Sequence, residues 1–93
     1  MLFSDIEKNL VDANIFGKLK KKKLKFISDH SEDANSSTLL VINNNKKFKR
    51  VYLKKAIEKG LDTIITNSYF KNLKITQIVV KNLDKEILKL LNL

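Results

Sequence analysis

The side chains best suited to covalent or metal chemistry are few, and most of them surround the only histidine. His30 is flanked by Ser28, Asp29 and Ser31, and the chain has no cysteine. The members of a Ser–His–Asp triad normally come from separate elements, so four adjacent residues favour a polar loop over a triad. A zinc site would need a second histidine or a cysteine. We therefore predict no catalytic residue and no metal site around His30.

The common glycine-rich nucleotide-binding motifs are absent from the sequence. The two glycines are Gly17 and Gly60, and neither G-x-x-x-x-G-K-[ST] nor G-x-G-x-x-G occurs. No enzymatic activity is therefore expected from this chain by itself. A binding module is the favoured class.

Lysine dominates the charge of the chain. The formal net charge is +9, and Arg50 is the only arginine among 19 basic residues. A charge of this size favours a polyanionic partner such as nucleic acid, phosphates or an acidic membrane surface. Proteins that read nucleic acid usually use arginine for bidentate contacts, however. Lysine, asparagine and isoleucine are also the amino acids of AT-rich codons, so we attribute part of the charge to the base composition of the genome. Nucleic acid is therefore not the favoured partner.

Length and hydropathy indicate one small domain over residues 1–93. Its 43% apolar residues are enough for a core. No apolar run approaches the roughly 20 residues of a membrane-spanning helix. The first residues, Met1 to Asp5, lack the pattern of a secretory signal. We expect a cytoplasmic location and no membrane partner.

The first half of the sequence predicts one helix and two strands. Ser4 and Glu7 have the spacing of a capping box, and apolar residues follow at helical spacing. Leu24 to Ile27 has the composition of a strand. Leu39 to Ile42 is a continuous apolar run, typical of a strand covered on both faces.

The centre of the sequence predicts a helix and a third strand. Phe48, Tyr52 and Ala56 recur every four residues, which predicts that they share the buried face of a helix. Gly60 is placed to end this helix. Leu61 to Thr66 follows as a strand.

The last part predicts a strand from Ile75 to Lys81 and a final helix that Asn82 can cap, with Leu83, Ile87, Leu90 and Leu91 as its apolar face. The complete order is helix, strand, strand, helix, strand, strand, helix. It predicts an α/β domain with a mixed, partly parallel sheet of about four to five strands and about three helices.

Three segments in the middle of the chain follow one another in a familiar order. They are Phe26-Ile27-Ser28-Asp29-His30-Ser31, Thr38-Leu39-Leu40-Val41-Ile42 and Ala56-Ile57-Glu58-Lys59-Gly60. This pattern resembles the N-terminal domain of the Mur ligases. There, an Asp-Ser-Arg motif precedes a Gly-Asp-Leu-Phe-Val-Ala strand and a helix that ends Ala-Ile-x-x-Gly-Ala. The resemblance covers Leu24 to Leu91.

Among these ligases, the spacing is most similar to that of UDP-N-acetylmuramoyl-L-alanyl-D-glutamate–diaminopimelate (or lysine) ligase. The enzyme that adds D-Ala-D-Ala has a similar N-terminal domain. The chain departs from the family pattern at His30 and Glu32, which stand at the aspartate and arginine of the motif. It departs again at Ser37-Thr38, which replaces Gly-Asp.

The resemblance implies a domain that binds UDP-N-acetylmuramoyl-peptide. Carried over by position, Asp29 and Ser31 would line the uridine pocket. Asn45, Lys46 and Lys47 would contact the nucleotide and its pyrophosphate. The parent enzyme would be an ATP-dependent, amide-bond-forming ligase. Its central and C-terminal domains, which hold ATP and Mg, are not part of this sequence, so no cofactor is expected in this chain.

Two other functions fit the sequence. A small basic nucleic-acid-binding protein would place Lys18–Lys25 and Lys46–Arg50 against phosphates. It would stack bases on aromatic residues, for which the candidates are Phe48, Tyr52, Tyr69 and Phe70. Aromatic residues make up only 8% of the chain, however, and those of the central helix are predicted to face the core. The third possibility is an interaction domain that kept the fold and lost the ligand, which the degenerate motif favours.

Overall fold

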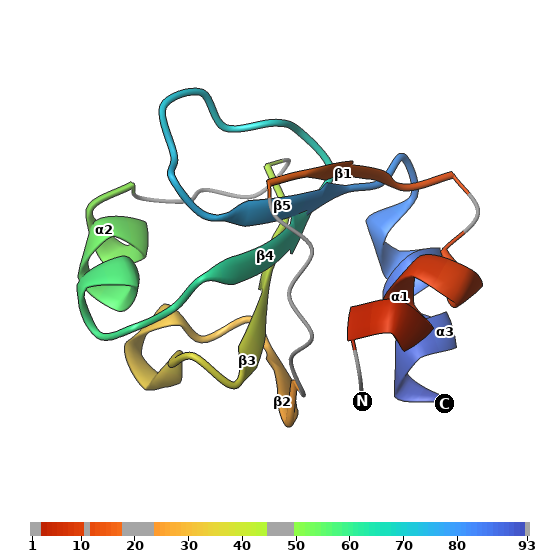
Figure 1. Cartoon of the computed structure of the whole chain (residues 1–93), viewed down its shortest axis with the longest axis horizontal. Helices are drawn as coiled ribbons and strands as arrows, with labels where there is room; N and C mark the ends of the chain where they lie inside the picture. Colours follow the sequence, from red (N-terminus) through yellow and green to blue (C-terminus); the bar gives the residue numbers. More distant parts are fainter. Residues whose placement is uncertain (1–2, 11, 18–23, 45–49, 93) are drawn as a thin grey trace.

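The computed structural model describes residues 3–10, 12–17, 24–44 and 50–92, and it contains one sheet with helices on both faces (Figure 1). In chain order the elements are α1 (Phe3–Asn9), β1 (Asn14–Phe16), β2 (Phe26–Ser28), the 3-10 helix η1 (Ser31–Asp33), β3 (Thr38–Ile42), α2 (Arg50–Glu58), β4 (Thr63–Thr66), β5 (Thr76–Val79) and α3 (Leu83–Leu91). The predicted α/β class is confirmed.

The sheet is mixed, with the strand order β1-β5-β4-β3-β2. Strands β2 to β5 are parallel to one another, and β1 is antiparallel to β5 with Ile15 opposite Ile78. The partly parallel sheet was predicted, whereas β1 was not. Gly17 directly follows β1 with φ +113°, and a Cβ there would lie 3.0 Å from the Cα of Thr76. A glycine is therefore needed where the chain leaves the sheet edge.

Two apolar cores lie on opposite faces of the sheet. One core joins the sheet to α1 and α3, and its buried members include Ile6, Leu10, Leu39, Ile65, Ile78 and Leu90. The other joins the sheet to α2 and to the connections after β2 and β4, and it includes Ala34, Leu40, Leu53, Ala56, Ile64 and Phe70. Successive residues of a strand point to opposite faces, so Leu39 and Leu40 contribute to different cores. The result is three layers, with α2 on one side and α1 and α3 on the other (Figure 1).

The inner strands are covered on both faces, as predicted for the run from Leu39 to Ile42. In β3 all side chains except that of Val41 are buried, and all four residues of β4 are buried. Burial of each large aliphatic side chain contributes about 1.5–3 kcal/mol. These two strands therefore fix the centre of the fold.

The buried face of α2 differs from the prediction. The helix begins at Arg50, and its buried side chains are Leu53 and Ala56. Tyr52 was predicted to face the core, but 48% of its surface is exposed. The buried stripe passes through Leu53 and Ala56, so Tyr52 falls on the solvent side of the helix. Phe48, predicted beside it, lies outside the described residues.

The predicted helix ends are partly confirmed. The side chain of Asn82 accepts a hydrogen bond from the backbone N–H of Lys85 at 3.2 Å, and so caps α3 as predicted. Gly60 follows α2 with φ +111°, as expected for a residue that ends a helix. Ser4 was predicted to precede α1 as its cap, but it is the second residue of that helix.

Among the described helices, none has the length and apolar character to cross a membrane. Most of the predicted lysine run, residues 18–23, lies outside the described residues.

Candidate functional site

Three asparagines join the loops that follow β3 and β4 at the carboxyl edge of the sheet. The backbone N–H of Asn44 donates to Oδ1 of Asn67 at 2.9 Å, and Nδ2 of Asn67 donates to Oδ1 of Asn43 at 2.9 Å. Nδ2 of Asn44 donates to the carbonyl of Ser68 at 3.2 Å. These bonds fix the chain at the point where it enters residues 45–47. The sequence did not predict that Asn67 bonds to Asn43 and Asn44.

An open groove lies between the carboxyl ends of β2 and β3 and the exposed side of α3. We call it the α3 groove. Its volume is about 730 Å³, within the range of small-molecule sites. Its lining residues are Ile27, Ser28, Asp29, His30, Val41, Ile42, Asn43, Leu83, Asp84, Ile87, Leu88 and Leu91.

The α3 groove has an apolar wall and an acidic rim. Leu88 and Leu91 of α3 are each 61% exposed on its wall. Asp29 and Asp84 supply carboxylates, and no lysine lines this groove within the described parts of the chain. Such a lining suits a planar, uncharged group with hydroxyl donors. It is unfavourable for a phosphate, which two carboxylates would repel.

A second groove lies on the other side of the β2 end, between η1 and α2. We call it the α2 groove. Its volume is about 490 Å³, and it is lined by Asp29, His30, Ser31, Glu32, Tyr52, Lys55, Ala56 and Lys59. Lys55 and Lys59 lie one helical turn apart and are both exposed. This groove therefore carries lysine ammonium groups, which the described lining of the α3 groove lacks, beside the carboxylates of Asp29 and Glu32.

Asp29 and His30 line both grooves. They follow β2 directly, and the His30 backbone N–H donates to Oγ of Ser28 at 3.0 Å, which forms a tight turn. Nε2 of His30 lies 3.4 Å from Oδ1 of Asp29, and both side chains are exposed. The two residues form a boundary over which one ligand could extend from one groove into the other.

The structure brings together only some of the site residues predicted from the sequence. Asp29 and Ser31 both line the α2 groove, and Asp29 also lines the α3 groove. Asn45, Lys46 and Lys47 lie outside the described residues. Their role in nucleotide contact therefore stays a prediction. The lysines of α2 were missed because nothing in the sequence relates them to Ser31, which precedes them by more than twenty residues.

A third hollow lies at the N-terminal end of β5. Phe16 and Tyr69 are half exposed there, with ring centroids 4.7 Å apart and planes inclined by 45°. Gln77 is buried nearby, and its side chain exchanges two hydrogen bonds of 2.9 Å with the backbone of Phe70. This arrangement holds the connection between β4 and β5 against the sheet.

Two further observations concern metal binding and the hydroxyl of Ser28. Within residues 3–10, 12–17, 24–44 and 50–92, no three His, Cys, Asp or Glu side chains are grouped so that they could hold a metal ion. The hydroxyl of Ser28 accepts a backbone hydrogen bond from the residue two positions later, a contact typical of a serine turn.

The three layers and the order of the strands can be compared with known proteins. The fold matches a segment of MurF. The crystal structure of MurF from Acinetobacter baumannii superimposes with a TM-score of 0.66 over 78% of this chain, at 18% sequence identity. The chain spans 16% of the length of that MurF chain. MurF is a Mur ligase, and a match at this identity shows a shared fold. No protein-family model and no curated protein matches the sequence.

Proposed function

We propose that this chain binds the uridine end of a UDP-N-acetylmuramoyl-peptide, with the nucleoside in the α3 groove. The observation that carries the proposal is the position of this groove in a fold shared with a segment of MurF. It opens at the carboxyl ends of two parallel strands, β2 and β3. Ligands of open α/β sheets bind outside the carboxyl ends of the strands.

The chemistry of the α3 groove supports a nucleoside. Ile27, Val41 and Leu88 offer an apolar surface for the faces of a base. The carboxylate of Asp29 can accept hydrogen bonds from ribose hydroxyls, as acidic side chains do in other nucleotide sites. The Ser28 hydroxyl accepts one hydrogen bond from the backbone and keeps its own proton for a ligand oxygen.

The residues carried over from the Mur ligase pattern take their places in this proposal. Asp29 contacts the ribose and Ser31 lies past the boundary in the α2 groove, while Asn45, Lys46 and Lys47, which lie outside the described residues, keep the nucleotide contacts that the resemblance implies. The hydrogen bonds of Asn44 support this arrangement, because they hold the start of the loop after β3 at the carboxyl edge of the sheet.

The chain would serve as the substrate-binding part of a longer ligase. It spans 16% of MurF, so ATP, Mg and the incoming amino acid would bind to other domains. Within this proposal, the spacing of the sequence favours the type that adds diaminopimelate or lysine to UDP-N-acetylmuramoyl-dipeptide. In the complete ligase, tighter binding of the dipeptide precursor than of the tripeptide precursor would support that type.

The test is an NMR titration of the labelled chain with uridine and with UDP-N-acetylmuramoyl-dipeptide. We expect saturable shifts at Ser28–His30 and along the groove side of α3. Leu88→Glu should abolish them, because it places a charge on the apolar wall. Val51→Glu is the matched control, since Val51 is a half-exposed apolar residue of α2 that lines neither groove. A wild-type chain without any response to uridine would refute the proposal.

One observation favours nucleic acid as a second candidate ligand. Tyr52 is exposed beside Lys55, where it could stack on a base while the lysine approaches a phosphate. A titration with single-stranded DNA tests this candidate. This candidate predicts salt-sensitive shifts around Tyr52 and Lys55, and it predicts that the shift of Lys55 is lost in Tyr52→Ala.

A further inference from the structure

We infer that the α2 groove binds the two phosphates of the same ligand, with Lys55 and Lys59 as its cationic contacts. The inference rests on the proposed function. It differs from the expectation that the lysines after β3 hold the pyrophosphate. It assigns this task to Lys55 of α2 and to Lys59, which directly follows that helix.

The first argument is that only one of the two grooves is lined by lysines. The described lining of the α3 groove carries the carboxylates of Asp29 and Asp84 and no lysine. The α2 groove carries the same Asp29 carboxylate and that of Glu32, but it also carries the ammonium groups of Lys55 and Lys59. Residues four apart on a helix are neighbours, so Lys55 and Lys59 can approach the same anion together. A pyrophosphate would therefore find lysine partners in the α2 groove and none in the described lining of the α3 groove.

The second argument is the reach of the lysine head group across the groove. Nζ of Lys59 lies 3.4 Å from the carbonyl oxygen of Glu32 in η1. The ammonium group of Lys59, which directly follows α2, therefore already spans the α2 groove to its opposite wall. The two walls are held together below it, because Ala34 and Ala56 are buried in the same core. A phosphate in the groove would meet a positive charge without rearrangement of the backbone.

The third argument is the continuity of the grooves at Asp29 and His30. In a nucleoside diphosphate the base is attached to C1′ of the ribose, whereas the phosphates extend from C5′, which is attached to C4′ on the other side of the ring oxygen. With the base against α3 and the ribose hydroxyls on Asp29, the 5′ side of the ribose points over this boundary. The exposed ring of His30 and the hydroxyl of Ser31 are then the next donors on the path.

The experiment compares the dissociation constants of uridine and UDP, because their ratio isolates the contribution of the phosphates. The test variant is Lys55→Met with Lys59→Met. The matched control is Lys54→Met with Lys85→Met, which removes the same charge from exposed positions that line neither groove. A third variant, Lys46→Met with Lys47→Met, tests the loop after β3.

We expect wild type to bind UDP about tenfold more tightly than uridine, as two exposed charge contacts would allow. The test variant should bring this ratio close to one and leave the affinity for uridine unchanged. The control should keep the ratio of the wild type. The gain should also decrease as salt is added, because the contacts are exposed.

Two results would overturn the inference, and they are distinguishable. If uridine binds and the ratio is lost only in the Lys46 and Lys47 variant, the phosphates bind at the loop, and the proposed function stands. If neither uridine nor UDP shifts the resonances of the wild type, the proposed function fails as well.

Discussion

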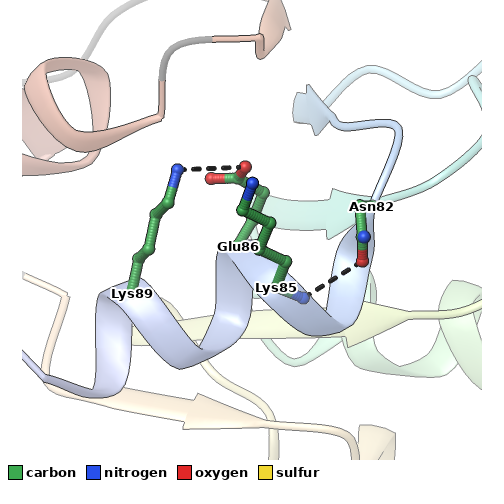
Figure 2. Close-up of polar contacts among 4 residues, drawn as sticks. All are labelled: Asn82, Lys85, Glu86 and Lys89. Atoms are coloured by element: carbon green, nitrogen blue, oxygen red, sulfur yellow. Dashed lines mark hydrogen bonds and ion pairs between the residues drawn. The ribbon is translucent and has the colours of Figure 1, made fainter.

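Replacing Glu86 by leucine is expected to stabilise the protein. Glu86 lies in α3, and only 7% of its surface is exposed. Its Oε1 lies 3.4 Å from Nζ of Lys89, one turn later (Figure 2). Its Oε2 is buried and has no hydrogen-bond partner among the residues that the structure describes. An oxygen in this position loses its hydration without compensation.

The size of the effect follows from these contacts. Removing an unsatisfied buried polar atom returns about 1–3 kcal/mol. The pair with Lys89 is worth about 0.5 kcal/mol, because the lysine side chain is 38% exposed. A carboxylate in the first turn of a helix contributes a further ~0.5 kcal/mol through the helix dipole. The net expectation for Glu86→Leu is a gain of about 1 kcal/mol in the free energy of unfolding.

The assay is urea unfolding monitored by circular dichroism, with the midpoint and slope fitted separately. A gain of 1 kcal/mol should also raise the melting temperature by about 4–8 °C in a domain of this size. Glu58→Leu is the control, since Glu58 is exposed on α2 and its replacement should change stability by less than about 0.5 kcal/mol. A loss of stability in Glu86→Leu, with a neutral control, would show that Oε2 has a stabilising partner and that the reasoning is wrong.

Three further substitutions test the structure. Gln77→Leu should cost about 2–4 kcal/mol in urea unfolding, because it removes the two buried hydrogen bonds between the Gln77 side chain and the backbone of Phe70. Hydrogen exchange should accelerate at Phe70, and unchanged exchange would contradict the contact. Asn82→Ala should cost about 1 kcal/mol through loss of the α3 cap, and a cost near zero would mean that the cap contributes nothing. Gly17→Ala should cost more than Gly60→Ala in thermal unfolding. Both residues have positive φ, but a new Cβ at Gly17 meets β5 at 3.0 Å, whereas at Gly60 the nearest atom is 3.8 Å away. Equal costs would show that backbone conformation alone decides the effect.

The centre of the fold could be predicted because its local signals agree. The run from Leu39 to Ile42 is apolar without interruption, and the strand it forms is covered on both faces. Asn82 stands directly before an amphipathic segment, and it caps α3. In both places, burial and local geometry favour the same assignment.

Strand β1 could not be predicted, because its conformation depends on a distant partner. Asn14-Ile15-Phe16 has three residues, of which only Ile15 is half buried. Its place at the sheet edge comes from pairing with β5 near the other end of the chain. Tyr52 was misplaced for a related reason. A four-residue period fits two adjacent faces of a helix, and the packing of Leu53 decided between them.

The grooves were predictable only in part. Asp29 and Ser31 follow strand β2, and both line the α2 groove, whereas their role in uridine binding stays a prediction. The bond between Asn44 and Asn67 depends on the parallel alignment of β3 and β4, and a single sequence does not contain that information. The same is true of the α2 lysines, which come near Ser31 only through the packing of α2 on η1.

The antiparallel edge strand has a consequence for how the chain folds. Strands β2 to β5 pair with their successors in sequence, so this part of the sheet can assemble progressively as the chain leaves the ribosome. Asn14 can pair with Val79 only after β5 has been synthesised, and α1 can contact α3 only after α3 has been synthesised. Pairings between such distant segments are slow to form. Until β5 and α3 emerge, the apolar residues of α1 have no partner from α3, so the N-terminal helix is the element most in need of protection from premature association during synthesis.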